Sequence, residues 1–158
     1  AGILISLQIF SVQVFSQDNN EVIAINQIAS KKSVTFSDAL KMFGYLLNKG
    51  NVSNKQIITA LKSSGVTKGL HYSEKSLLRK GTIALILAQY YKFGDSLLYM
   101  IFKNERYATR ALIANGLLDK DSSEWDTVKG EELIELFSSA MKLKEKDNFK
   151  NFSDYENK

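Results

Sequence analysis

The sequence predicts an all-α protein, a small helical repeat array or bundle of about six helices. Two observations indicate this fold: apolar residues recur at the i, i+3, i+4, i+7 spacing of an amphipathic helix, and capping motifs and glycines bound these segments. The chain has 158 residues, the size of one domain, and its 44% hydrophobic content is enough for a core. We expect a single helical domain over residues 17–143 and a polar flexible tail over residues 144–158.

The uncharged first segment, AGILISLQIFSVQVFS (residues 1–16), has two interpretations. It closes with Val14 and Ser16 at the positions that precede a cleavage site, and polar residues follow from Gln17, as at the end of a secretory signal peptide. Its alternating apolar and polar side chains also fit a β-strand. It is too short for a transmembrane helix, and we predict no transmembrane span. We favour a signal-peptide remnant, which implies export to the periplasm or cell envelope of a bacterium.

Caps and apolar faces predict the helices that follow. The apolar segment Val22–Ala29 fits a helix or a strand. Capping-box spacing occurs at Thr35–Asp38 and at Ser53–Gln56, and Asn104 can cap a later helix. The predicted helices are, in order, Phe36–Asn48, Asn54–Ser64, Arg79–Lys92, Ser96–Phe102, Glu105–Asn115 and Lys129–Leu143.

An internal repeat underlies this pattern. The segment Ile58–Val66 aligns with Thr109–Leu117 at an offset of 51, so that Ala, Leu and Gly coincide. The shared glycines, Gly65 and Gly116, are expected to end their helices in the left-handed conformation. The second helices align at an offset of 49, and Thr35–Leu47 resembles a further second helix. We therefore expect two full helix–loop–helix units and one half unit, which stack because one unit cannot bury its apolar face alone.

Three segments carry a family resemblance: Val34–Leu40, Leu78–Ala84 and Val128–Leu133. Each looks like the Thr-Arg-Ala-Glu opening and aliphatic run of the second helix in the S-layer homology repeat, whose arginine is retained at Arg79. The resemblance covers residues 34–142, and the pattern is also similar to small exported spirochaete-like envelope proteins. It implies a helical repeat fold that binds an anionic wall polysaccharide.

Charge is segregated along the chain, which carries 21 Lys and Arg and 17 acidic residues for a net charge of +4. Residues 1–30 sum to −2, residues 31–110 to +10 and residues 111–158 to −4. Such a basic block attracts an anionic partner or another copy of the chain. A coding bias toward AT-rich DNA also explains the excess of lysine, and we favour that explanation. The scarcity of arginine argues against a nucleic-acid partner.

The inventory of reactive residues disfavours an enzyme. The chain has no Cys and one His, which excludes disulfides, thiolate sites and multi-histidine metal sites, and His71 is interpreted as a surface or turn residue. Glycine-rich phosphate-binding motifs are absent. The acidic loop Asp119–Asp126 lacks the EF-hand spacing, and we expect it to be solvated, with Trp125 packed onto the core. We predict no catalytic residue, no metal and no cofactor.

Arginine is the best candidate for recognition chemistry in this lysine-rich chain. Arg106 and Arg110 are spaced i, i+4 and project from one helical face, with Tyr107 nearer the core side. The guanidinium group offers the planar bidentate contact with carboxylate or phosphate that lysine lacks. Ion pairing within the chain is the competing explanation. The predicted ligand- or partner-binding residues are Arg79, Arg106, Tyr107 and Arg110.

Together these features predict a non-catalytic exported envelope protein that acts as a structural or protein-interaction module. Its partner would be another protein of the cell envelope or a second copy of the chain. The alternative, implied by the S-layer homology resemblance, is a binding module for an anionic cell-wall polysaccharide.

Overall fold

The all-α prediction is confirmed. The computed structural model describes residues 19–50, 52–93 and 103–156, and within them the chain forms six helices and no extended strand. They are the N-terminal helix (19–29), α2 (Phe36–Leu46), α3 (Asn54–Ser63), α4 (Lys80–Tyr91), α6 (Glu105–Ala114) and α7 (Gly130–Glu156). The segment 1–16 and the predicted helix Ser96–Phe102 lie outside the described residues.

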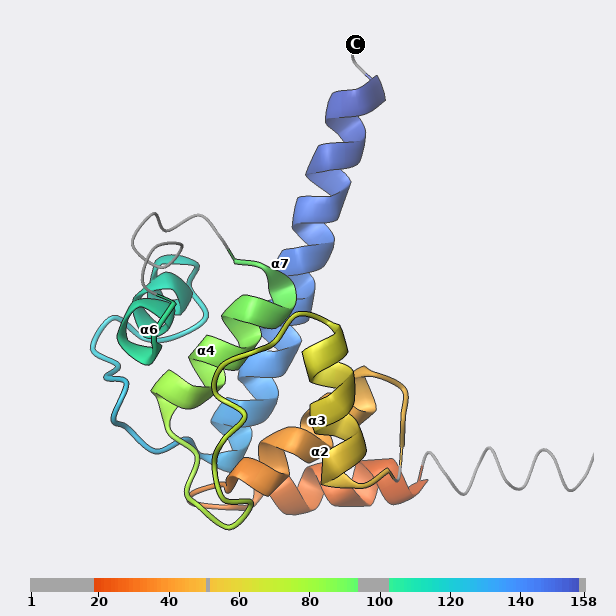
Figure 1. Cartoon of the computed structure of the whole chain (residues 1–158). Helices are drawn as coiled ribbons and strands as arrows, with labels where there is room; N and C mark the ends of the chain where they lie inside the picture. Colours follow the sequence, from red (N-terminus) through yellow and green to blue (C-terminus); the bar gives the residue numbers. More distant parts are fainter. Residues whose placement is uncertain (1–18, 51, 94–102, 157–158) are drawn as a thin grey trace, which may run out of the picture.

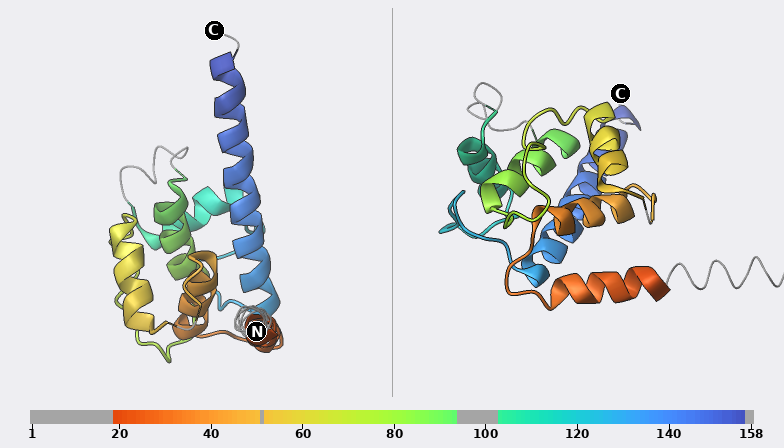
Figure 2. Two further views of the ribbon diagram at one scale, coloured as in Figure 1. Left: turned by 90° about the vertical axis from the view of Figure 1, so that its right-hand side faces the viewer. Right: turned by 60° about the horizontal axis from the view of Figure 1, so that its bottom comes forward.

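The helices form a body around the first half of α7. Helices α2 and α4 both contact α7, while α3 packs on α2 and α6 packs on α4 (Figure 1). The N-terminal helix lies at the base of the body, beside the start of α7 (Figure 2). Every residue from Gly81 to Ala88 in α4 is buried, as expected for a helix that is apolar on all sides.

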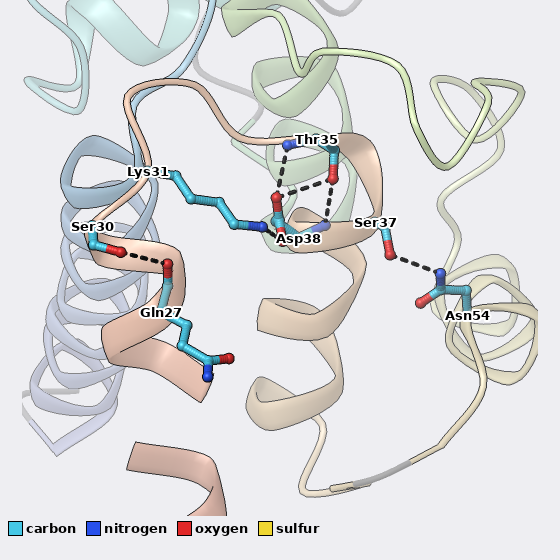
Figure 3. A network of polar contacts seen from close by, with 7 residues as sticks. All are labelled: Gln27, Ser30, Lys31, Thr35, Ser37, Asp38 and Asn54. Atoms are coloured by element: carbon cyan, nitrogen blue, oxygen red, sulfur yellow. Dashed lines mark hydrogen bonds and ion pairs between the residues drawn. The ribbon is translucent and has the colours of Figure 1, made fainter. Parts of the chain in front are cut away.

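Local capping explains where the helices begin. The Thr35 hydroxyl accepts from the Asp38 backbone N–H, and the Asp38 carboxylate accepts from the Thr35 N–H, so the predicted capping box is present (Figure 3). Ser53 and Gln56 form the second box, and Asn104 caps α6. Each cap satisfies backbone donors that the first turn of a helix leaves without partners.

The capping carboxylate of α2 is buried and is also paired. Lys31 Nζ lies 2.7 Å from Asp38 Oδ1, and the Thr35 N–H lies 2.8 Å from the other oxygen (Figure 3). Burial alone would raise the pKa of Asp38, but the hydrogen bonds from Lys31 and Thr35 outweigh it and lower that pKa. Asp38 is therefore held as a carboxylate at the start of α2.

A backbone triangle joins the three segments that precede α2, α4 and α7. The Leu78 N–H donates to Val34 O at 2.9 Å, the Val128 N–H to Leu78 O at 3.0 Å, and the Val34 N–H to Val128 O at 3.0 Å. The three side chains are at most 1% exposed. Three segments far apart in sequence are thus closed into a ring, so the units do not stack as an open array.

The loops that lead into the triangle also cap α2 and α4, with hydrogen bonds at equivalent positions of the two helices. The first two N–H groups of α2 donate to Ser76 O and Glu74 O, and those of α4 donate to Asp126 O and Glu124 O. In α7 the Gly130 N–H donates to Lys31 O. Each of these helices therefore begins on the loop of another unit, and no unit is complete alone.

The structure revises the repeat in two respects. The N-terminal helix and α2 form a third unit, with a shorter connection than the other two, where the sequence predicted only half a unit. The offset of 51 between α3 and α6 holds, and both predicted stops, Gly65 at φ +93° and Gly116 at φ +70°, are left-handed. The triangle instead aligns α4 with α7 at an offset of 50 rather than 49, because the loop from Gly116 to Val128 is one residue shorter than the loop from Gly65 to Leu78.

The helix α7 extends beyond its predicted end at Leu143. It continues to Glu156, through residues expected to form a loose tail, and its second half projects from the body (Figures 1 and 2). Lysine and glutamate are good helix formers, and no glycine or proline interrupts this stretch. No helix in the described part of the chain combines the length and apolar character that a membrane crossing requires.

Candidate functional site

Arg79 lies at the centre of an aromatic cluster. Its Cζ atom is 5.2 Å from the ring centroid of Trp125 and 5.9 Å from that of Tyr72. Both distances are within the range of cation–π attraction. We refer to Arg79, Tyr72 and Trp125 as the Arg79 cluster, whose guanidinium group is held by two rings from two different loops.

The backbone triangle explains why these residues meet. Arg79 directly follows Leu78 of the triangle and forms a backbone bridge with Thr127, so the loop before α7 passes beside it. Trp125 stands between Glu124 and Asp126, whose carbonyl oxygens cap α4. The peptide groups around Trp125 are therefore fixed by the fold, although its ring stays outside the core.

The exposure of Trp125 corrects one expectation. Trp125 is 67% exposed, whereas the sequence predicted that it packs onto the core. The neighbouring carbonyl groups are used to cap α4, and the indole ring lies at the surface beside Arg79. A large exposed aromatic ring beside an oriented guanidinium group is a common composition of binding surfaces.

The guanidinium group of Arg79 has no carboxylate partner within the described residues. The ion pairs found there are Lys31–Asp38 and Lys80–Glu132, both of which stabilise the starts of helices. Arg79 is the N-cap residue of α4, but its side chain makes no capping hydrogen bond. Its donors can therefore be offered to an external anion in the bidentate geometry that favours carboxylate and phosphate.

Tyr72 is fixed from both ends. Its hydroxyl donates to the Glu105 carboxylate, which also accepts from the Thr82 hydroxyl at 2.9 Å, and its ring packs on Phe36 at 5.8 Å between centroids. Burial raises the pKa of Tyr72, the hydrogen bond to Glu105 raises it further, and the charge of Arg79 opposes this. Tyr72 is thus a neutral, oriented ring under the guanidinium group.

A shallow pocket adjoins this cluster on the Tyr72 side. It has a volume of about 450 Å³ and is lined by Lys68, Gly69, His71, Tyr72, Leu85, Lys103, Asn104 and Glu105. Two lysines and a histidine thus face a single carboxylate, that of Glu105. Because the two lysines outnumber this carboxylate, the charged side chains of the lining carry a net positive charge, which favours an anion.

The four predicted site residues are only partly placed together. Arg79 is in the cluster, but Arg106 and Arg110 are exposed on α6, and no contact within the described residues joins either to Arg79. Tyr107 is half-buried on the same helix. Glu105, which lies between the N-cap residue Asn104 and Arg106, is the residue of α6 that contacts the Arg79 cluster, through the hydroxyl of Tyr72.

The two aromatic partners of Arg79 and the basic pocket were not predicted from the sequence. Tyr72 and Trp125 lie in different loops, and only the backbone triangle brings them to Arg79. The positions equivalent to Arg79 in α2 and α7 are Thr35 and Lys129, so the cluster occurs at one of three similar places.

The described residues gather no group of three metal-ligating side chains. Comparisons with protein-family models, curated proteins and solved structures found no match to this chain.

Proposed function

We propose that this chain is a non-catalytic binding module of a bacterial cell envelope, and that the Arg79 cluster binds an acidic group of an anionic wall polysaccharide. The observation that carries the proposal is the guanidinium group of Arg79, stacked by two rings and without a carboxylate partner within the described residues. An anion bound there would replace solvent without first breaking an internal ion pair.

The composition of the cluster supports a carbohydrate ligand. The exposed face of Trp125 offers an apolar surface of the size of a sugar ring, and Arg79 offers donors beside it for a carboxylate or phosphate substituent. The basic middle of the chain, at +10 over residues 31–110, favours association with a polyanion. The resemblance of Leu78–Ala84 to the S-layer homology opening agrees with this ligand class.

A protein partner is the second candidate. Tryptophan and arginine are the residue types most enriched in the energetic centres of protein interfaces, and the Arg79 cluster contains both. An acidic peptide segment of another envelope protein would use the same guanidinium donors. This candidate retains the proposed export and the non-catalytic role and changes only the ligand.

Binding to purified cell wall tests the proposal and separates the two candidates. The wall fraction is used untreated, after protease digestion, and after chemical reduction of its carboxyl groups. A polysaccharide ligand survives protease, and a carboxylate ligand is lost on reduction. A protein ligand is lost on protease digestion.

Variants test the role of the cluster in the same assay. Arg79→Ala is expected to weaken binding by about 10-fold or more, since hydrogen bonds to charged groups contribute about 1.5–3 kcal/mol. Arg79→Lys should not restore it, because an ammonium group cannot form the bidentate contact. The control is Lys55→Ala, which removes one exposed positive charge from α3. Equal loss in Lys55→Ala and Arg79→Ala would show that only net charge matters and would refute the site.

A further inference from the structure

The pocket beside Tyr72 is basic although one of its walls is acidic. Lys68, His71 and Lys103 contribute nitrogen donors, and Glu105 is the single acidic side chain in the lining. The hydroxyls of Tyr72 and Thr82 both donate to Oε1 of the Glu105 carboxylate, which ties this single negative charge to Tyr72 and to α4. The two lysine ammonium groups outnumber this one carboxylate, so the charged side chains of the lining are net positive.

The loop that carries Lys68 is built into the fold. The Gln89 side chain on α4 accepts from the Thr67 and Lys68 backbone N–H groups at 2.9 and 3.1 Å, and it donates to Lys68 O at 3.0 Å. Gly69 has φ +83°, and a Cβ atom there would lie 3.0 Å from Ile86 Cγ1. The loop thus lies directly on α4, and the left-handed turn that places it requires glycine.

Tyr72 connects this pocket with the Arg79 cluster. Its ring lies under the Arg79 guanidinium group, and the same side chain lines the pocket. The hydroxyl bond to Glu105 and the contact with Phe36 fix the ring between the two places. Two positions suited to anions are therefore held side by side on one rigid aromatic residue.

From this arrangement we propose that the pocket formed by Lys68, His71 and Lys103 is a second anion subsite, so that the ligand is a linear polyanion with acidic groups on successive units. This inference rests on the proposed function, because it assigns Arg79 the first acidic group. Linking two acidic groups in one chain makes the second contact intramolecular, and a longer fragment then binds more tightly than a single unit without a new contact at Arg79.

The test is isothermal titration of the full chain with fragments of two polymers. One is a polyuronate, which carries a carboxylate on each sugar, and the other is a poly(glycerol phosphate), which carries a phosphate on each unit. Each is used as one unit and as fragments of three or more units. The two arms identify which acidic group the subsites accept, and the two lengths measure the contribution of the second subsite.

Paired variants with equal loss of charge make the test specific. The subsite pair is Lys68→Gln with Lys103→Gln, and the control pair is Lys41→Gln with Lys55→Gln, which changes exposed lysines of α2 and α3 outside the pocket. The wild type and the control pair should bind the longer fragment of at least one polymer at least 10-fold more tightly than the single unit. The subsite pair should lose this gain but still bind the single unit.

The outcomes separate the subsite from the proposed function. A length effect that survives in the subsite pair, or that falls equally in both pairs, overturns the second subsite. Equal binding of short and long fragments, abolished by Arg79→Ala, also overturns it and leaves the proposed function standing. No binding of either polymer at any length overturns both.

Discussion

Replacing Gly130 by alanine tests whether the ring of units holds the fold together. Gly130 is the first residue of α7, where its N–H donates to Lys31 O at 2.9 Å. A Cβ atom built there would lie 1.8 Å from Ile28 O and 2.7 Å from Ala29 O. Both are backbone atoms of the N-terminal helix, so no side-chain rotation can relieve the overlap.

The magnitude follows from what must move. The N-terminal helix must shift by at least about 1 Å, since non-bonded heavy atoms attract best at roughly 3.5 Å. Overpacking of this kind costs about 1–3 kcal/mol, and the lost hydrogen bond adds about 1 kcal/mol. We expect Gly130→Ala to lower the free energy of unfolding by about 2–4 kcal/mol, out of a total of about 5–15 kcal/mol for a typical domain.

Thermal unfolding by circular dichroism measures this loss. For a chain of this length, the expected decrease in Tm is about 5–15 °C. The matched control is Gly44→Ala within α2, where the new Cβ would meet Ile57 Cδ1, a rotatable methyl group, at 3.1 Å. Alanine also favours the helix by about 1 kcal/mol, so this variant should melt at or above the wild-type temperature. If Gly130→Ala melts with the wild type, the contact between the N-terminal helix and α7 does not stabilise the fold.

Three further predictions concern the helix stops, the buried tyrosines and pH. Gly65→Val and Gly116→Val should each destabilise the chain by about 1 kcal/mol or more through backbone strain alone, since φ is +93° and +70° and no atom lies within 4 Å of either new Cβ; urea unfolding of both variants checks this. Burial raises the pKa of Tyr91 from 10.0 to about 12, and its hydroxyl has no hydrogen-bond partner within the described residues. Stability should therefore fall as the pH rises from 10 toward 12, and Tyr91→Phe should remove that loss without destabilising the chain at neutral pH. By contrast, Tyr72→Phe should lower the free energy of unfolding by about 1–3 kcal/mol, because it breaks a hydrogen bond to a carboxylate. Because the pKa of Asp38 in the folded chain is below its ordinary value of 3.8, the Asp38 carboxylate stabilises the fold at pH values above 3.8. This contribution should be lost as the pH falls through the folded-state pKa, and acid unfolding of Asp38→Asn should lack that step.

The starts of α2 and α3 and the ends of α3 and α6 were predictable because their causes are local. The capping boxes at Thr35–Asp38 and Ser53–Gln56, and the left-handed stops at Gly65 and Gly116, depend on residues within a few positions of one another. The triangle was not predictable from these signals. It depends on hydrogen bonds between backbone groups far apart in sequence, which leave no characteristic side chain at Val34, Leu78 or Val128.

The candidate site was half predictable for the same reason. Arg79 could be selected because arginine is scarce in this chain and its chemistry is distinctive. Its aromatic partners could not be selected, since Tyr72 and Trp125 come from two loops that meet only when the backbone triangle forms. Arg106 and Arg110 satisfied the spacing rule for one helical face, but the rule does not say what that face meets.

Truncation of the N-terminus distinguishes a removable leader from a part of the fold. If residues 1–16 are a signal-peptide remnant, a chain that begins at Gln17 should melt with the full-length chain, because it retains the N-terminal helix and the acceptor for Gly130. A chain that begins at Lys32 loses Lys31 O and the buried Ile28, and it should be destabilised at least as much as Gly130→Ala. Circular dichroism melts of the three chains, and the intact mass of the protein from its native source, make the measurement. Equal destabilisation of both truncated chains would contradict the leader and favour the strand interpretation of residues 1–16.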